Sequence, residues 1–238
     1  MPQPFLSIVI PTFNEEARIS GTLSRVIEYL TTQDYQWEIV VADDGSIDHT
    51  IRLVDLEIVK HSNIRVLHLP HRGKGWAVKN GMLAAEGEYR VISDADLSVP
   101  IEQLDRLLPP LGPDADIVLG SREAPAASRI GEPLGRHFMG RVFNRLAAML
   151  VAPGLADTQC GFKCFSSEAA RDIFPRLTLD GFAFDVELFH LARNRGVSYS
   201  EVGVDWYYQP ESKVRPLRDA LAMTFDLLKI RWRHRNSD

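Results

Sequence analysis

Residues 89–98 read Tyr-Arg-Val-Ile-Ser-Asp-Ala-Asp-Leu-Ser (YRVISDADLS), a short apolar run that ends abruptly on two carboxylates, Asp94 and Asp96. A run of this length predicts a buried strand at 89–93. Two like charges directly after a buried strand destabilise each other unless a cation or water compensates them. The stretch therefore predicts a strand whose carboxyl end carries a polar site.

The same alternation of apolar runs and helix-like segments extends through the first half of the chain. Apolar spacing typical of helices follows each run, for example over residues 15–30 and from 74 to about 86. Strands that alternate with helices indicate an α/β fold, with a mostly parallel central sheet and helices on both faces. The other predicted strands are 5–10, 37–42, 63–69 and 115–120.

Polar clusters follow four of these strands. In a parallel sheet, ligands bind in the crevice beyond the carboxyl ends of the strands. We therefore expect the four clusters to line one crevice. They are PTFNEE (11–16), DDGS (43–46), HRGKG (71–75) and DADLS (94–98).

Composition limits the class of protein. The 238 residues are 45% hydrophobic, which predicts one domain, 1–238. A net charge of −5 argues against a nucleic-acid binder. The two cysteines, Cys160 and Cys164, have no second pair to complete a zinc site, so we expect reduced thiols in a cytoplasmic protein. The N-terminus lacks the features of a signal peptide, and no apolar run reaches the roughly 18 residues of a membrane span.

Asp94 and Asp96 are candidate metal ligands. Residues i and i+2 of an extended strand point the same way, so both carboxylates can converge on one cation. Mg²⁺ or Mn²⁺, which prefer oxygen ligands and substrate phosphates, are the expected ions. The alternative is a solvated turn before a helix capped by Ser98, with Pro100 in its first turn.

Two further clusters suit a nucleoside diphosphate. Asp43 and Asp44 diverge, so one could accept a hydrogen bond from a base or ribose while the other supports the turn; a plain turn is the alternative. Arg72 and Lys74 stand between glycines where a helix begins, which indicates an anion site for a diphosphate. The spacing matches neither a P-loop nor G-x-G-x-x-G.

The downstream half adds charged residues in apolar surroundings. Arg122 follows the strand at 115–120, and DTQCGFK supplies Asp157 and Lys163. FAFDVELF places Asp185 and Glu187 in an apolar context. Each has a structural alternative, since Asp157 could cap a turn and Asp185 a helix.

In combination, these motifs resemble the inverting family 2 glycosyltransferases with the GT-A (Rossmann-like) fold. Within that family they resemble the dolichyl-phosphate and polyprenyl-phosphate beta-glucosyltransferases and the related dolichol-phosphate mannosyltransferases. The resemblance covers nearly the whole chain, and RGKGWAVKNGM with DTQCGFK is similar to the glucosyl branch. The matching stretches are SIVIPTFNEEARI, WEIVVADDGSIDHT, HRGKGWAVKNGMLAAEGEYRVISDADLS, IVLGSRE, DTQCGFKCF, FAFDVELFHLA and ESKVRPLRDAL.

The resemblance implies roles for individual residues. Asp157 would lie near the reacting centre, and Ser98 departs from the mannosyl branch, where a longer amide is common. The implied nucleotide-sugar contacts are Pro11, Thr12, Glu15, Asp43, Asp44, Lys74, Asp94 and Ala95; the metal ligands are Asp94 and Asp96; the acceptor-phosphate contacts are Arg122, Arg129, Arg136, Lys163, Lys213 and Arg215.

The implied reaction is a metal-dependent inverting displacement that moves a hexose, glucose from UDP-glucose, to a polyprenyl or dolichyl phosphate. A lipid phosphate is already anionic and needs charge compensation from residues such as Arg122 and Lys163. A hydroxyl acceptor needs a base, for which Asp157 is the candidate. The alternatives are a soluble transferase with a small phosphorylated or hydroxylated acceptor, mannosyl transfer from GDP-mannose, and a binding module without turnover.

A lipid acceptor requires contact with a membrane surface. Residues 217–235 predict a basic amphipathic helix, whose apolar face includes Leu221, Phe225, Leu228 and Trp232. The segment 213–235 carries seven basic and two acidic residues, so its net charge of +5 contrasts with a net charge of −10 for the rest of the chain. Residues 138–151 form a second apolar stripe; for both, core packing is the alternative. We expect a protein peripheral to the inner, cytoplasmic face of the membrane.

Overall fold

The computed structural model describes residues 3–133, 135, 141, 145, 154–210, 225–227 and 229–234. Seven strands form one sheet in the order β3-β2-β1-β4-β7-β5-β8. All pairings in it are parallel except those of β7, which runs antiparallel to both neighbours. The strands are β1 (Leu6–Thr12), β2 (Trp37–Asp43), β3 (Ile64–His68), β4 (Tyr89–Ser93), β5 (Ile117–Ser121), β7 (Phe162–Ser166) and β8 (Tyr199–Gly203).

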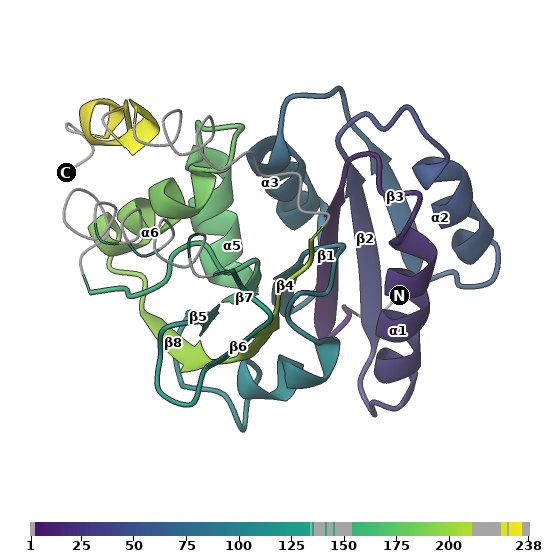
Figure 1. The fold of residues 1–238 in the computed structure, drawn as a ribbon, viewed down its shortest axis with the longest axis horizontal. Helices are drawn as coiled ribbons and strands as arrows, with labels where there is room; N and C mark the ends of the chain where they lie inside the picture. The colour runs from purple at the N-terminus through teal and green to yellow at the C-terminus, as the bar shows by residue number, and fades with distance from the viewer. Residues whose placement is uncertain are drawn as a thin grey trace.

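Helices cover both faces of this sheet, as predicted (Figure 1). One apolar core lies under α1 (Ile19–Thr31), α2 (Thr50–Ile58) and the 3₁₀ helix η1 (Ile101–Arg106). The other lies under α3, α5 and α6. The bounds on this second face are α3 (Lys74–Ala84), α5 (Ser167–Ile173), the 3₁₀ helix η2 (Phe174–Arg176) and α6 (Phe184–Asn194).

The reversed strand β7 determines which segments meet at the functional edge. Ser93, the last residue of β4, pairs with Phe162, the first residue of β7. The segment 157–161, which precedes β7, therefore lies at the edge where the parallel strands end. The sequence did not predict this strand, because its apolar pattern lies within a motif interpreted only for its charges.

Two local expectations are corrected. The first strand does not end at residue 10 before the proline, because β1 continues through Pro11 to Thr12 and proline only removes one donor from the ladder. The helix expected from Ser98 is instead η1, which begins at Ile101 after Pro100 and has no side-chain cap.

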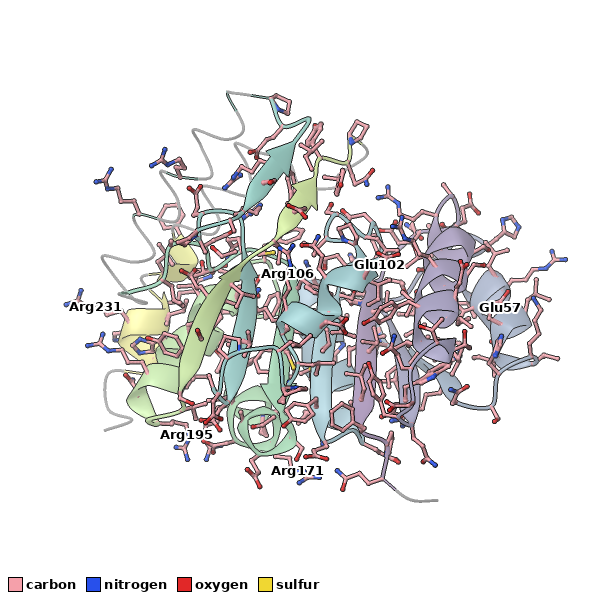
Figure 2. The ribbon with its side chains drawn as sticks, turned by 90° about the horizontal axis from the view of Figure 1, so that it is seen from below. Glu57, Glu102, Arg106, Arg171, Arg195 and Arg231 are labelled. Atoms are coloured by element: carbon pink, nitrogen blue, oxygen red, sulfur yellow. The ribbon has the colours of Figure 1, made fainter. Side chains whose placement is uncertain are left out.

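Two smaller elements complete the described structure. A two-stranded ribbon of β6 (Ser128–Ile130) and β9 (Asp205–Tyr207) stands out from the main sheet (Figure 2). Residues 225–227 and 229–233 are helical near the C-terminus. None of the helices in the described part of the chain has the length and hydropathy needed to cross a bilayer.

Candidate active site

Asp94 and Asp96 follow β4 directly and have different partners. The Asp94 carboxylate lies 2.7 Å from the ammonium of Lys74, the first residue of α3. Asp96 accepts a hydrogen bond of 2.9 Å from the backbone N–H of Ser98. Burial and the charge of Asp94 raise the pKa of Asp96. Among the described residues, no lysine or arginine forms an ion pair with Asp96; the charge of Lys74 acts on this partly buried acid without direct contact.

This pair fits a divalent metal ion with a small protein ligand set. A raised pKa for Asp96 is what a positive charge beside it would reverse. No group of three or more His, Cys, Asp or Glu side chains in the described ranges is arranged to hold a metal. Mg²⁺ usually binds through one or two carboxylates together with substrate phosphates, and two carboxylates are what this edge provides.

Acidic and basic side chains alternate around Lys74. Asp185, in the first turn of α6, accepts a hydrogen bond of 2.8 Å from the ammonium of Lys163 on β7. Burial alone would lower the pKa of Lys74, but the charges of Asp94 and Asp185 outweigh it and raise that pKa. Lys74 is therefore fixed as a cation at the N-terminus of α3, where the helix dipole adds positive potential.

Gly161 brings the segment before β7 against the carboxylate pair. A Cβ added at this glycine would lie 2.0 Å from Oδ2 of Asp94. The next residue, Phe162, pairs with Ser93, so the close approach is fixed by the sheet. Only glycine leaves the Asp94 carboxylate its present position.

Arg122 and Asp157 form a bidentate ion pair. The guanidinium nitrogens Nε and Nη2 of Arg122 lie 2.6 and 2.8 Å from the two oxygens of Asp157, which is fully buried. Glu201 of β8 accepts the backbone N–H of Asp157 at 2.9 Å, and the Trp206 ring lies beside the guanidinium. Burial by itself would raise the pKa of Asp157, but Arg122 holds it well below its usual range.

The adjacent acids Asp43 and Asp44 diverge as predicted, and both support backbone. Asp43 accepts hydrogen bonds from the Thr12 hydroxyl and from the N–H and hydroxyl of Ser46. Asp44 accepts the N–H groups of Arg72 and Gly73, each at 2.9 Å. Both acids are 2% exposed. The pair therefore connects the ends of β1, β2 and the glycine-flanked loop 71–75.

The remaining predicted donor contacts also lie at this edge. Pro11 is partly buried near the end of β1, and the carbonyl of Ala95 accepts a hydrogen bond from Thr22 of α1. Glu15 forms an ion pair of 2.9 Å with Arg18. Pro11 and Glu15 lie at the end of β1 and Ala95 follows β4, so they lie at the carboxyl ends of two neighbouring strands.

The predicted acceptor contacts are less uniform. Lys163 is 1% exposed and bonded to Asp185 and to the carbonyl of Cys160, so it is withdrawn from the surface on which a phosphate would bind. Arg129 lies 2.6 Å from both Glu123 and Glu132, and these carboxylates neutralise it. Arg122 is also paired, but with a single acid, Asp157. Arg136, Lys213, Arg215 and most of the stripe 138–151 lie outside the described residues.

A known protein family matches most of this chain. The family model described as glycosyl transferase family 2 matches residues 7–174, from the second residue of β1 to beyond β7, with the carboxylate pair inside this range. The chain belongs to this family. The resemblance predicted from the motifs is therefore confirmed, and so is the class of enzyme, a glycosyltransferase.

Three relatives of this glycosyltransferase, each from a different organism, share the same name. The chain is 36% identical, over 97% of its length and 75% of the relative's, to a dolichyl-phosphate beta-glucosyltransferase of Dictyostelium discoideum. A protein of the same name from Homo sapiens is 34% identical over 98% of this chain and 76% of its own. The corresponding values for Saccharomyces cerevisiae are 32%, 95% and 74%.

Solved structures confirm the GT-A fold of this glycosyltransferase. Glucosyl-3-phosphoglycerate synthase from Mycobacterium tuberculosis, in complex with phosphoglyceric acid, superposes with a TM-score of 0.69. It is 22% identical and covers 95% of this chain and 78% of its own. Another complex of that enzyme, with Mn²⁺, UDP-glucose and glycerol 3-phosphate, gives 0.65 at 20% identity and the same coverage. A likeness at this identity shows the fold alone.

Two residues of this glycosyltransferase site were missing from the sequence prediction. Asp185 was noted only for its apolar context, and the structure places its charge within reach of both Lys74 and Lys163. Gly161 had no signal except its place in DTQCGFK. Recognising either residue as part of the site requires the position of β7 in the sheet, and apolar periodicity alone does not give that position.

Proposed function

We propose that this glycosyltransferase is a metal-dependent inverting hexosyltransferase that moves glucose from UDP-glucose to a dolichyl or polyprenyl phosphate. The single observation that carries the proposal is the Asp94–Asp96 pair, in which Asp96 is a partly buried acid with a raised pKa and no ion pair among the described residues. The relatives' name, dolichyl-phosphate beta-glucosyltransferase, supports the sugar and the acceptor. Residues 1–238 act as one catalytic domain.

The proposed roles follow from charge and position. Lys74 and the N-terminus of α3 attract the diphosphate of the donor, while the edge formed by Pro11, Thr12, Glu15 and Asp43 receives the base and ribose. Asp94 and Asp96 hold the Mg²⁺ or Mn²⁺ ion. The ion would stabilise negative charge on the leaving diphosphate.

The state of Asp157 favours a phosphate acceptor over a hydroxyl. A general base needs a pKa near the working pH, whereas Arg122 holds the pKa of Asp157 well below its usual range. Asp157 is therefore a weak base, and its bidentate ion pair holds the Arg122 guanidinium in position. An acceptor phosphate is already ionised and requires only a cation to orient it, a role that Arg122 can perform.

A lipid acceptor implies contact with a membrane surface, and the C-terminal helical segment suits this. Leu227 and Ile230 are fully buried in the core, so part of the predicted helix packs against the body. Phe225 and Trp232 are 64% and 77% exposed. Figure 2 shows Arg231 at the outer edge of the molecule. Aromatic and basic side chains together suit an anionic interface.

Free, buried thiols at Cys160 and Cys164 are consistent with the cytoplasmic, inner face of that membrane.

One assay tests the proposal. The protein is incubated with labelled UDP-glucose, Mn²⁺ and a short polyprenyl phosphate, with GDP-mannose as the competing donor. Label in a product that extracts into organic solvent supports the proposal. Label only in an aqueous product supports a small acceptor instead, preference for GDP-mannose supports mannosyl transfer, and tight binding without transfer supports a binding module.

A further inference from the structure

The turn at 178–181 packs directly against the glycine-flanked loop 71–75. A Cβ added at Gly73, whose φ is +133°, would lie 2.5 Å from the carbonyl oxygen of Asp180. A Cβ at Gly75 would lie 2.6 Å from the carbonyl oxygen of Leu179. The backbones thus meet with no side chain between them, and the position of the loop depends on the position of the turn.

Hydrogen bonds join the same two segments. The N–H of Trp76 donates to the carbonyl of Asp180 at 3.2 Å. The Arg72 guanidinium donates twice to the Asp180 carboxylate, at 2.6 and 3.0 Å. Lys74 lies between these two contacts in the sequence. Any shift of the turn would therefore move the cation that the site presents.

Glu187 of α6 holds this turn. Its carboxylate is fully buried and accepts the N–H groups of Thr178 and Leu179, each at 2.9 Å. It also accepts the hydroxyl of Thr178 at 2.6 Å. A buried carboxylate that accepts three hydrogen bonds holds the backbone of residues 178 and 179 in place, because leaving the carboxylate or any of its donors unpaired costs free energy.

The C-terminal helical segment reaches the same carboxylate. Nε2 of His234 lies 2.8 Å from Oε1 of Glu187, and both groups are buried. The Arg233 guanidinium donates to the hydroxyl of Thr178 at 2.7 Å. One acid therefore connects the C-terminal segment, the turn and, through the turn, the loop of Lys74.

We propose that Glu187 is a positioning residue for the donor diphosphate. It acts through the turn 178–181 on the loop 71–75 and so fixes Lys74 at the site. His234 couples the C-terminal segment to this arrangement. The inference rests on the proposed function, in which Lys74 meets the diphosphate.

The test compares Glu187→Gln with Glu28→Gln, the same chemical change at an exposed position of α1. Hydrogen exchange of a peptide covering residues 72–78 is measured without substrate, and donor KM and kcat are measured with UDP-glucose. In Glu187→Gln the Trp76 amide should exchange faster, and KM should rise about 3- to 10-fold with a smaller change in kcat, as expected for one or two weakened hydrogen bonds. Glu28→Gln should match the parent protein.

Unchanged exchange at Trp76 together with unchanged KM would overturn the inference. If Glu187→Gln does not fold, Thr178→Val takes its place, because it removes only the hydroxyl that Glu187 and Arg233 share. The same two outcomes then decide. Absence of turnover in the parent protein would instead count against the proposed function, since the exchange measurement needs no substrate.

Discussion

Gly161 is a residue at which the backbone lies directly against the Asp94 carboxylate. Gly161→Ala would place a methyl group 2.0 Å from the present position of Oδ2 of Asp94, so the carboxylate must rotate away. If Asp94 binds the metal ion as proposed, a displacement of this size should lower kcat about 100-fold. The free energy of unfolding should change by less than about 2 kcal/mol, because the short side chain can yield.

The matched control is Gly21→Ala in α1, where nothing lies within 4 Å of the added Cβ. This variant should keep full activity and gain up to about 1 kcal/mol of stability from helix propensity. Steady-state kinetics and urea unfolding measure both variants. Normal turnover in Gly161→Ala would show that the position of Asp94 does not matter for transfer.

Asp96→Asn isolates the charge at the second carboxylate. The amide oxygen can still accept the N–H of Ser98, so the fold should persist. Burial and Asp94 raise the pKa of Asp96, so removal of its charge should leave the unfolding midpoint unchanged or slightly higher. Metal-dependent transfer should be lost. Turnover equal to that of the parent protein at any Mn²⁺ concentration would refute the assignment of Asp96 as a metal ligand.

The Asp157–Arg122 pair should leave a signature in stability against pH. The folded pKa of Asp157 is lowered, so its contribution is complete above the ordinary aspartate pKa and is lost progressively as pH falls from there through the folded value. Asp157→Asn leaves Arg122 buried without its partner, which should cost about 3–5 kcal/mol at neutral pH.

The difference in unfolding free energy between the parent protein and Asp157→Asn should be constant from pH 8 to pH 5. It should shrink below about pH 4, where the unfolded chain takes up the proton first. Urea unfolding across this range measures it. A difference that instead shrinks near neutral pH would show that Asp157 has a raised pKa and is available as a base.

At the scale of elements, β7 explains why the sequence predicted the site only in part. Asp44, Asp94 and the loop 71–75 each follow a parallel strand, so the rule for strand ends placed them together correctly. Lys163 belongs to a strand that enters the sheet in reverse, and Gly161 directly precedes it. The orientation of this strand depends on pairing with residues about 70 positions earlier. Periodicity identifies strands but carries no information about such pairing.

The C-terminal helical segment has a buried face and an exposed face, and substitutions on each can test their roles separately. Ile230 is fully buried, and Ile230→Ala should cost about 2–5 kcal/mol of stability. Trp232 is 77% exposed, and Trp232→Ser should leave stability unchanged but lower binding to anionic vesicles about tenfold or more. Val59→Ser, at an exposed apolar residue after α2, is the control and should change neither property. Equal vesicle binding by Trp232→Ser and the parent protein would contradict the surface proposed for this segment.

At the scale of the whole molecule, one segment carries a net charge opposite in sign to that of the protein. The protein carries −5, yet residues 213–235 carry +5, so an anionic surface repels most of the molecule and attracts one segment. Because the attraction is local, it should be strongest at low salt and weaken as the Debye length falls from about 10 Å at 0.1 M to about 3 Å at 1 M. Sedimentation with vesicles that contain anionic lipid should therefore show strong binding at low salt and weak binding at high salt.

Neutral vesicles should bind the protein weakly at every salt concentration. Arg231→Glu should flatten the salt dependence, because Arg231 is exposed at the outer edge of the C-terminal segment (Figure 2). Arg52→Glu makes the same change in total charge on an exposed residue of α2, and it should behave as the parent protein does. Equal effects of the two substitutions would mean that total charge governs the association and that the C-terminal segment does not direct it.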